Sequence, residues 1–427
     1  MYFATKETNE RRWAVTASPS SVLIVGAGLA GAKTAEALRE RGYQGQVTLI
    51  GAEGHLPYER PPLSKGMLLG KSAFDEAVVH PEDWYRDNHV ELRPGTEVVA
   101  VHPEAAEIEL AGGERLGYGK LVLATGSEPR RLPLPGADAR NVFTLRTRED
   151  SDAIRATFGA GRRLVIIGGG WIGLEVAAAA READTAVAVL EAAELPLLAV
   201  LGHEMATVFA DLHRGHGVDL RLGAHVSAIS SEGGTATGVR LADGEQLPAD
   251  AVVIGVGAAP RLDLAVSAGL DINTGVLVDE SLRTSNPDIY AVGDIAEQDH
   301  KVLGRRVRVE HWANALNQPA TAAAAILGDA AGYDRLPYFF TDQYDLGMEY
   351  VGFAAVGEYA RVVVRGELDK REFVAFWLSA DDTVLAAMNV NVWDIGDEVK
   401  PLIAGRVRID VDKLASTDVP LSEVAAG

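Results

Sequence analysis

An uninterrupted apolar run near the N-terminus, residues 22–25, ends in closely spaced glycines, and a stretch with helical spacing follows over residues 32–41. A short apolar run without polar alternation predicts a buried parallel strand. Gly26 permits a tight turn, Gly28 lets the backbone approach a phosphate, and Gly31 lets helix pack closely on strand. Because the N-terminus of a helix offers free N–H groups to an anion, this unit predicts a dinucleotide pyrophosphate site.

The same pattern occurs again in the middle of the chain. Residues 163–167 form a second apolar run, which leads into Gly168, Gly170 and Gly173 and then into a predicted alanine-rich helix over residues 174–181. One such pattern is a weak signal. Two in one chain predict two dinucleotides bound side by side, usually a flavin and a nicotinamide nucleotide.

Each unit also has an acidic residue where a nucleotide ribose is expected. Strands are predicted over residues 46–50 and 187–190, and Glu53 and Glu191 follow them, each about 20 residues after the last glycine of its turn. A carboxylate there accepts hydrogen bonds from ribose hydroxyls, and the alternative for Glu53 is an ordinary exposed loop carboxylate. Residues 192–200 contain no Arg or Lys for a 2′-phosphate, so we expect NADH rather than NADPH.

A proline-rich segment places two cations close together after the first unit. Arg60 and Lys65 flank Pro61 and Pro62, and consecutive prolines predict a rigid, extended backbone. A positive charge beside a flavin ring stabilises its anionic reduced form. The alternative is a pair of surface cations beside a loop.

Two later strands end in residues that suit a cofactor site. The strand over residues 120–123 leads into the small residues 124–126, which permit a close approach of backbone to a ligand. The strand over residues 289–292 leads into Asp294, whose carboxylate can accept hydrogen bonds from ribityl hydroxyls or cap a helix. We expect these residues to lie in the first nucleotide site.

The pattern changes near residue 336. Alternating runs predict strands over residues 350–356, 360–364, 372–378 and 383–388, followed by a helix over residues 394–403. This is typical of an α+β domain with an antiparallel sheet. The predicted fold class is therefore α/β, with two Rossmann-like dinucleotide-binding domains in a glutathione-reductase-like architecture and an α+β C-terminal domain.

Composition excludes several other classes. The 427 residues carry a formal net charge of −21, which argues against nucleic acid as a partner, and they contain no cysteine for a disulfide or a thiolate metal site. We expect residues 1–20 to be a flexible lead-in, because no apolar segment follows Arg11 and Arg12 as a twin-arginine signal requires. No run reaches the roughly 18 to 20 apolar residues of a membrane span, so we expect no membrane contact and a cytoplasmic protein.

The histidines offer only a weak metal signal. His213 and His216 have a spacing that a helix could bring together, but Gly215 and Gly217 are expected to break that helix. No acidic ligand joins them at a zinc-like interval. We therefore expect no metal site.

Taken together, the chain resembles the FAD-dependent NAD(P)H:ferredoxin and rubredoxin reductase family, of the putidaredoxin reductase type with a reductase C-terminal domain, which serves oxygenase and cytochrome P450 systems. It is similar, more distantly, to apoptosis-inducing factor. The resemblance covers nearly everything from about residue 20 to residue 427. Its most specific pieces are residues 60–65 (RPPLSK), 168–175 (GGGWIGLE), 293–294 (GD), 310–312 (EHW) and 339–344 (FFTDQY).

The resemblance implies an FAD-binding domain in two segments, residues 21–130 and 257–335, with an NADH-binding domain inserted over residues 131–256 and a C-terminal interface domain over residues 336–427. It also implies that Lys65 pairs with Glu175 beside the flavin and that Trp312 lines the flavin edge, although a single Trp is more often a core residue. His311 is a candidate proton relay or a packed neighbour of the site. The catalytic candidates are therefore Lys65, Glu175 and Trp312, and the cofactor-binding candidates are Gly26, Gly28, Ala30, Gly31, Glu53, Arg60, Lys65, Ala124, Thr125, Gly126, Arg130, Gly168, Gly170, Trp171, Ile172, Gly173, Glu191, Gly257, Gly293, Asp294, Glu310, His311 and Trp312.

The expected function is electron transfer. A hydride from NADH delivers two electrons, whereas an iron–sulfur cluster accepts one at a time, and a bound flavin can hold the pair and release it singly. Without cysteine, electrons have no internal dithiol to reach, so they must leave for an external ferredoxin or rubredoxin. A switch protein similar to apoptosis-inducing factor and an NADH:quinone diaphorase are the alternatives, and the chain is expected to be a monomer or a homodimer.

The acidic charge of the chain raises a question about docking, because ferredoxins are also usually acidic. A local cationic patch at Arg305, Arg306 and Arg308, together with Arg130 and Arg131, would allow docking. The alternative is that these arginines only pair with neighbouring carboxylates.

Overall fold

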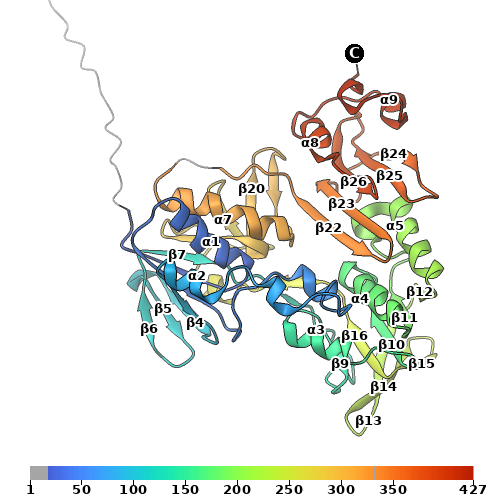
Figure 1. Ribbon diagram of the computed structural model, residues 1–427, viewed down its shortest axis with the longest axis horizontal. Helices are drawn as coiled ribbons and strands as arrows, with labels where there is room; N and C mark the ends of the chain where they lie inside the picture. The colour runs from blue at the N-terminus through green and yellow to red at the C-terminus, as the bar shows by residue number, and fades with distance from the viewer. Residues whose placement is uncertain (1–17, 330–331, 427) are drawn as a thin grey trace, which may run out of the picture.

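The computed structural model describes residues 18–329 and 332–426 (Figure 1). The lead-in predicted over residues 1–20 therefore lies, up to residue 17, outside the described residues. Three large sheets, each with its own helices, build the fold, and residues far apart in the sequence contribute to the first of them.

The first sheet contains five parallel strands in the order β19-β7-β1-β2-β3. Its strands are β1 (Ser21–Val25), β2 (Gln46–Ile50), β3 (Val90–Arg93), β7 (Lys120–Leu123) and β19 (Ile289–Ala291). Helices α1 (Leu29–Glu40) and α7 (Trp312–Ile326) lie side by side and share an apolar core with this sheet (Figure 1). The sheet therefore joins β1 to β19, a strand from much later in the chain, Ile289–Ala291.

The turn between β1 and α1 explains why the first glycines are needed. Gly26 has a φ of +112°, and a Cβ there would lie 2.2 Å from the carbonyl oxygen of Ala124. A Cβ at Gly31 would lie 2.0 Å from the carbonyl oxygen of Gly26. The helix begins at Leu29, three residues before the predicted start, because the tight turn lets helical geometry begin directly after Gly28.

The second sheet repeats this plan with five parallel strands in the order β12-β11-β10-β16-β9. Its strands are β9 (Val142–Phe143), β10 (Arg163–Ile167), β11 (Ala186–Glu191), β12 (Asp219–Leu222) and β16 (Ala251–Ile254), and its helices are α3 (Arg148–Arg155), α4 (Trp171–Glu182) and α5 (Leu198–Gly215). Helix α5 includes His213 and ends at Gly215, and Gly217 has a φ of +77°, so the helix stops at the glycines expected to break it and does not extend to His216. A glycine in the last turn of a helix that is packed along its length is tolerated at roughly 1 kcal/mol.

Smaller elements complete the two units. The short sheets are β4 (Val98–His102) with β5 (Glu107–Leu110) and β6 (Arg115–Gly117); β13 (Val226–Glu232) with β14 (Thr235–Leu241) and β15 (Gln246–Pro248); β8 (Ser127–Pro129) with β17 (Ala258–Pro260); and β18 (Val276–Val278) with β20 (Ala296–His300) and β21 (Arg305–Val307). The short helices are α2 (Glu82–Asp87) and α6 (Asp263–Ser267). The pair β8 and β17 carries the chain from the first unit to the second and back.

The third sheet is antiparallel, with five strands in the order β22-β23-β26-β25-β24. Its elements are β22 (Tyr338–Gln343), β23 (Leu346–Gly352), β24 (Arg361–Glu367), β25 (Glu372–Leu378), β26 (Val384–Val390), α8 (Gly396–Ala404) and α9 (Val411–Ala415). Only the strand predicted over residues 350–356 differs much from its observed bounds, and it begins and ends four residues earlier. Strand β23 ends at Gly352, whose φ of +98° is outside the β region.

The proline pair also differs from the prediction. Residues Pro61–Ser64 form a 3₁₀ turn, not an extended segment. A φ near −65° suits the first turn of a helix as well as it suits an extended chain, and the missing proline N–H has no partner to lose at that position. The segment is therefore rigid, as expected, but it turns back and directs Lys65 toward helix α4.

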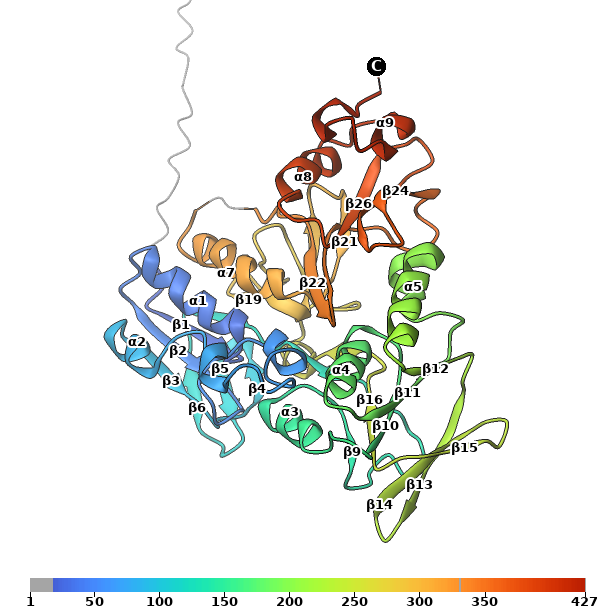
Figure 2. The same cartoon turned by 45° about the vertical axis from the view of Figure 1, so that its right-hand side comes forward.

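The three sheets pack against one another. In Figure 2, α5 lies below the C-terminal sheet and β22 extends down toward α4 and α7, and side chains of α4, α5 and the C-terminal sheet share one apolar core. These features confirm the predicted α/β class with its α+β C-terminal part. The domain boundaries given above, at residues 130, 256 and 335, stay a prediction. Among residues 18–329 and 332–426, no helix is long and apolar enough to cross a membrane.

Candidate functional site

A cavity of about 1160 Å³ lies where the two parallel sheets and β22 meet. Its wall includes the β1–α1 turn, the end of the Pro61–Ser64 turn, the first residues of α4, and Phe339 and Phe340 of β22. Small-molecule sites typically occupy about 300–1,000 Å³. The cavity is thus large enough to serve more than one nucleotide.

Most of the residues expected to bind cofactor line this cavity. They are Gly26, Gly28, Ala30, Glu53, Arg60, Lys65, Ala124, Thr125, Gly126, Gly170, Trp171, Ile172, Glu175, Gly257, Gly293, Asp294, Glu310, His311 and Trp312. The exceptions are Gly31, Arg130, Gly168, Gly173 and Glu191.

Three of the exceptions are glycines of the two turns that lie outside the cavity wall, against neighbouring backbone. A Cβ at Gly173 would lie 2.2 Å from the carbonyl oxygen of Gly168, and one at Gly168 would lie 2.4 Å from that of Gly255. Gly31 has the corresponding position in the first unit. Gly31 and Gly173 permit helix and strand to pack closely, the role that the sequence predicted for the third glycine, and Gly168, with a φ of +107°, permits the tight turn.

The other two exceptions are held elsewhere. Glu191 lies at the end of β11, where its carboxylate accepts hydrogen bonds from the backbone N–H groups of Gly169, at 2.7 Å, and Ala193, at 2.8 Å. Arg130 is exposed, and its Nε donates to the carbonyl oxygen of Ala258 at 2.9 Å. Arg130 is not among the cavity-lining residues, although its neighbours Pro129 and Ala258 are, so its predicted cofactor contact stays a prediction.

Lys65 and Glu175 form an ion pair in the cavity wall. Lys65 Nζ lies 2.7 Å from Glu175 Oε1, and the two side chains are 16% and 3% exposed. The lysine follows the Pro61–Ser64 turn and the glutamate lies in the second turn of α4, so the pair joins the two nucleotide-binding units. A buried ion pair persists only where further hydrogen bonds satisfy the charges, and Ser64 and Thr341 both donate to Glu175.

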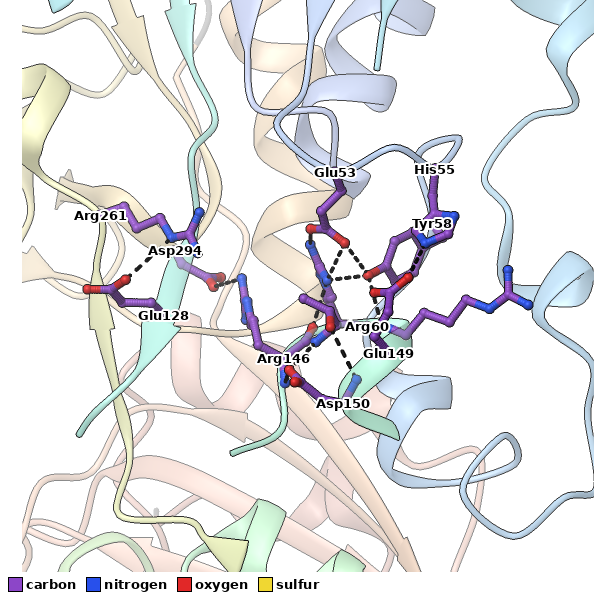
Figure 3. A network of polar contacts seen from close by, with 12 residues as sticks. Glu53, His55, Tyr58, Arg60, Glu128, Arg146, Glu149, Asp150, Arg261 and Asp294 are labelled. Carbon is purple, nitrogen blue, oxygen red and sulfur yellow. Dashed lines mark hydrogen bonds and ion pairs between the residues drawn. The ribbon is translucent and has the colours of Figure 1, made fainter. Parts of the chain in front are cut away.

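A second polar group surrounds Glu53 (Figure 3). Arg60 forms an ion pair with the Glu53 carboxylate, and Tyr58 donates to the same carboxylate at 2.5 Å. Burial acts to raise the pKa of Glu53, but the hydrogen bonds and charge of Arg60 outweigh it and hold the pKa below its usual value. Glu53 is therefore a paired carboxylate on the cavity wall, not an ordinary exposed loop residue.

Arg146 is a site residue that the sequence did not reveal. Figure 3 shows it between the Glu53 group and Asp294, and its Nη2 lies 3.4 Å from Asp294 Oδ2. Burial lowers the pKa of this guanidinium. The only local signal is the capping box of α3, in which Thr147 and Asp150 fix the helix start and so position Arg146 just before it.

Asp294 accepts hydrogen bonds from neighbouring side chains and does not cap a helix. It lies in a single 3₁₀ turn, Gly293–Ile295, with no side-chain cap hydrogen bond. Its Oδ2 accepts from the Ser127 hydroxyl at 3.0 Å as well as from Arg146. The carboxylate lies on the cavity wall, where the interpretation as a ligand contact placed it.

His311 and Trp312 also line the cavity, at the start of α7. Trp312 donates its indole N–H to Glu59 at 3.1 Å, and His311 lies 4.9 Å from the Phe339 ring. Burial lowers the pKa of His311 to about 4, so the imidazole is neutral at pH 7. Its Nδ1 is buried and has no hydrogen-bond partner within the residues that the structure describes.

These residues fit two dinucleotides. Helices α1 and α4 begin directly after Gly28 and Gly170, which provide no side-chain cap, so each presents free backbone N–H groups where the glycine turn meets the cavity. A Cβ at Gly28 would meet nothing within 4 Å, which leaves space for a phosphate.

Two glycine turns that open helices at one cavity, with an ion pair between them, define an oxidoreductase that binds two dinucleotides. Residues 20–319 match the family model described as pyridine nucleotide-disulphide oxidoreductase, and residues 338–425 match the model described as reductase C-terminal. The chain belongs to the pyridine nucleotide-disulphide oxidoreductase family.

Curated relatives cover nearly the whole chain. It is 42% identical to the 5,5′-dehydrodivanillate O-demethylase ferredoxin reductase subunit of Sphingobium sp., over 95% of this chain and 98% of the relative. It is 38% identical to putidaredoxin reductase of Pseudomonas putida, over 95% and 97%. It is 36% identical to a rubredoxin–NAD(+) reductase of Pseudomonas putida, over 81% and 89%.

A solved structure agrees with these relatives. The covalent putidaredoxin reductase–putidaredoxin complex contains a chain that superposes with a TM-score of 0.91 at 38% identity, over 95% of this chain and 97% of that chain. The fold and the resemblance stated from the sequence are thereby confirmed.

Proposed function

We propose that this protein is an FAD-dependent reductase that takes a hydride from NADH and passes single electrons to a ferredoxin or rubredoxin of an oxygenase system. The observation that carries the proposal is the Lys65–Glu175 ion pair on the wall of one cavity, between the N-termini of α1 and α4. The relatives named as ferredoxin and rubredoxin reductases support the choice of acceptor.

Residues of the first unit would hold FAD. The Gly26–Gly28 turn and the N-terminus of α1 would bind the pyrophosphate, and Glu53 would accept from the ribose. Arg146 and Asp294 would bind polar groups of the same nucleotide, since both lie on the cavity wall. When bound, FAD supplies the ability to accept two electrons together and release them one at a time.

Residues of the second unit would hold NADH. The N-terminus of α4 would bind its pyrophosphate, and Glu191 would accept from the ribose hydroxyls that an extra phosphate blocks in NADPH. Two backbone N–H groups fix the Glu191 carboxylate at the end of β11. A fixed negative charge there supports the preference for NADH.

Lys65 and Glu175 would prepare the reaction site between the two nucleotides. The ammonium holds positive charge at the cavity wall, which favours the extra electrons that hydride transfer delivers. Glu175 fixes the lysine in place. The chain contains no cysteine, so no internal dithiol competes for these electrons.

The predicted cationic docking patch has less free charge than the sequence indicated. Arg305 pairs with Glu358 and Arg308 pairs with Glu310 at 2.7 Å. Both pairs match the alternative that these arginines bind neighbouring carboxylates. Docking of the iron–sulfur protein would then depend on the surface around the cavity mouth more than on net positive charge. A cytoplasmic location and a monomeric or homodimeric state stay predictions.

An anaerobic titration tests the proposed function. Purified yellow protein is reduced with NADH and then mixed with one oxidised ferredoxin or rubredoxin at a time. We expect stoichiometric loss of flavin absorbance with NADH and rapid recovery with a suitable acceptor. Reduction by NADH followed by recovery only with quinone would favour the diaphorase alternative and contradict the proposal.

A further inference from the structure

Glu175 receives one of its hydrogen bonds from outside both nucleotide-binding units. Thr341 Oγ1 donates to Glu175 Oε1 at 2.5 Å, alongside Lys65 Nζ at 2.7 Å and the Ser64 hydroxyl. Thr341 lies on β22, the edge strand of the C-terminal sheet, and is 1% exposed. The C-terminal sheet thus contacts the carboxylate that holds the cavity lysine.

The Thr341 hydroxyl in turn accepts a hydrogen bond from a neighbour on the same strand. Gln343 Nε2 donates to Thr341 Oγ1 at 3.2 Å, and Gln343 Oε1 lies 2.8 Å from Nε2 of His213. Thr341 and Gln343 are two residues apart on a strand, so they share one face. Gln343 is 1% exposed and His213, on α5, is fully buried, so water does not compete for these hydrogen bonds.

The Glu175 carboxylate determines which group donates in each of these hydrogen bonds. An ionised carboxylate only accepts, so the Thr341 hydroxyl donates to Glu175 and needs a donor for its own lone pair. The Gln343 amide supplies that donor, which turns its oxygen toward His213. Burial lowers the pKa of His213 to about 4, so at pH 7 the neutral ring donates its one N–H to Gln343.

We propose that Thr341 and Gln343 are positioning residues of the hydride-transfer site, which hold Glu175, and through it Lys65, in the geometry that faces the cavity. The proposal rests on the function proposed above and extends it. It makes the C-terminal sheet a part of the redox site in addition to any role in binding a partner. Phe339 and Phe340, on the same strand, already line the cavity.

The role has an electrostatic consequence. Without the Thr341 hydroxyl, one donor is lost from Glu175 and more of its negative charge acts on the cavity. Added electrons are then less favourable, so the midpoint potential of bound FAD shifts to a more negative value. Because Lys65 is also held less firmly, flavin reduction by NADH slows about tenfold. The KM for NADH changes little, because Glu191 and the α4 turn are untouched.

The test compares Thr341→Val, which removes the hydroxyl and keeps the shape, with Thr341→Ser, which keeps the hydroxyl. Thr185→Val is the matched control, because Thr185 is fully buried and its hydroxyl accepts one hydrogen bond, from Gly159 N–H at 2.8 Å, away from the cavity wall. Gln343→Met removes the amide behind Thr341 without changing Thr341. The readouts are the FAD midpoint potential and the separate kcat and KM for flavin reduction.

We expect Thr341→Val to lower the potential and kcat, Gln343→Met to do so to a smaller extent, and Thr341→Ser to recover the wild-type values. Thr185→Val should leave both quantities unchanged. A wild-type potential and kcat in Thr341→Val, or in Gln343→Met if Thr341→Val does not fold, would overturn the inference while wild-type reduction by NADH still supports the proposed function. Failure of NADH to reduce the wild-type protein would instead overturn the proposed function itself.

Discussion

At the scale of single residues, the site depends on how its charges are paired. Lys65 and Lys71 both form ion pairs with helix α4, but their surroundings differ. The Lys65–Glu175 pair is buried, whereas the Lys71 side chain is 64% exposed. Removing one partner of a buried pair leaves an uncompensated charge, while most exposed pairs contribute little.

We therefore predict different effects for two matched substitutions. Lys65→Met should destabilise the fold by about 3 kcal/mol, because Glu175 stays buried without its cation, and should slow flavin reduction by NADH at least about tenfold. Lys71→Met should change neither quantity by more than about 0.5 kcal/mol or twofold. Urea unfolding and stopped-flow reduction measure the two effects. Equal stability and equal reduction rates of the two variants would contradict the prediction that burial makes the Lys65–Glu175 pair more important than the Lys71–Glu182 pair.

The choice between nucleotides is a second property of single residues. We expect kcat/KM for NADH to exceed that for NADPH by more than about tenfold, because the fixed Glu191 carboxylate repels a 2′-phosphate. Glu191→Gln, which removes the charge, should reduce that preference. Steady-state kinetics with both nucleotides decide the point, and equal efficiency of the wild-type protein with both would contradict it.

Some site residues could be found in the sequence and others could not. Glycine turns leave a local signature, so Gly26, Gly28 and Gly170 were found at the cavity wall. Arg146 and Thr341 reach their partners only through tertiary packing across more than 100 residues. No local pattern distinguishes Arg146 from other Arg residues, and the segment FFTDQY marked the region of Thr341 without showing that Thr341 contacts Glu175.

At the scale of elements, helix α5 shows how the C-terminal sheet holds the second unit. The helix is interrupted at Gly202, which has a φ of +75°. The freed carbonyl of Leu201 accepts a hydrogen bond from the Trp377 indole at 3.2 Å, and a Cβ at Gly202 would lie 2.0 Å from the Tyr359 hydroxyl. Both aromatic residues belong to the C-terminal part of the chain. The interruption is therefore a contact point between domains.

Two glycines of α5 should respond in opposite ways to alanine. Gly202→Ala should destabilise the protein by about 1–3 kcal/mol, because the left-handed backbone disfavours a Cβ and the Tyr359 hydroxyl must move. Gly215→Ala, where a Cβ meets nothing within 4 Å, should stabilise it by up to about 1 kcal/mol. Denaturant unfolding measures both changes. A gain in stability for Gly202→Ala would contradict this account of the interruption.

The burial of His213 in α5 predicts a pH dependence of stability. The pKa of His213 is about 4 in the folded protein and about 6.5 for an ordinary histidine, so the unfolded chain binds the proton more strongly between these values. The contribution of His213 is complete above about pH 6.5 and is lost as the pH falls toward 4, up to about 3 kcal/mol.

Unfolding at pH 7 and pH 5 tests this prediction. The wild-type protein should lose more stability between the two values than His213→Gln, which cannot titrate. His203→Gln, at a more exposed position on the same helix, is the control and should behave as wild type. Equal losses in all three proteins would place the pH dependence elsewhere.

The elements themselves were largely predictable. Apolar runs that end in glycine located β1, β10 and the helices after them, because burial and turn geometry act on neighbouring residues. The Pro61–Ser64 turn was misjudged because proline fixes φ but not ψ, and the surrounding packing chose the 3₁₀ form.

At the scale of the whole molecule, the central claim is a route for electrons from NADH through one cavity to an external iron–sulfur protein. The three sheets converge on that cavity, and each contributes to its wall. The net charge of −21 and the pairing of Arg305 and Arg308 mean that acceptor binding should depend on a specific surface.

The most direct test is NADH-driven reduction of cytochrome c by the purified flavoprotein, with and without a panel of ferredoxins and rubredoxins. Our account predicts a large, saturable acceleration by at least one of them. If NADH reduces the flavin but no ferredoxin or rubredoxin accelerates cytochrome c reduction, while quinones are reduced rapidly, the claim that the protein is a ferredoxin or rubredoxin reductase is contradicted.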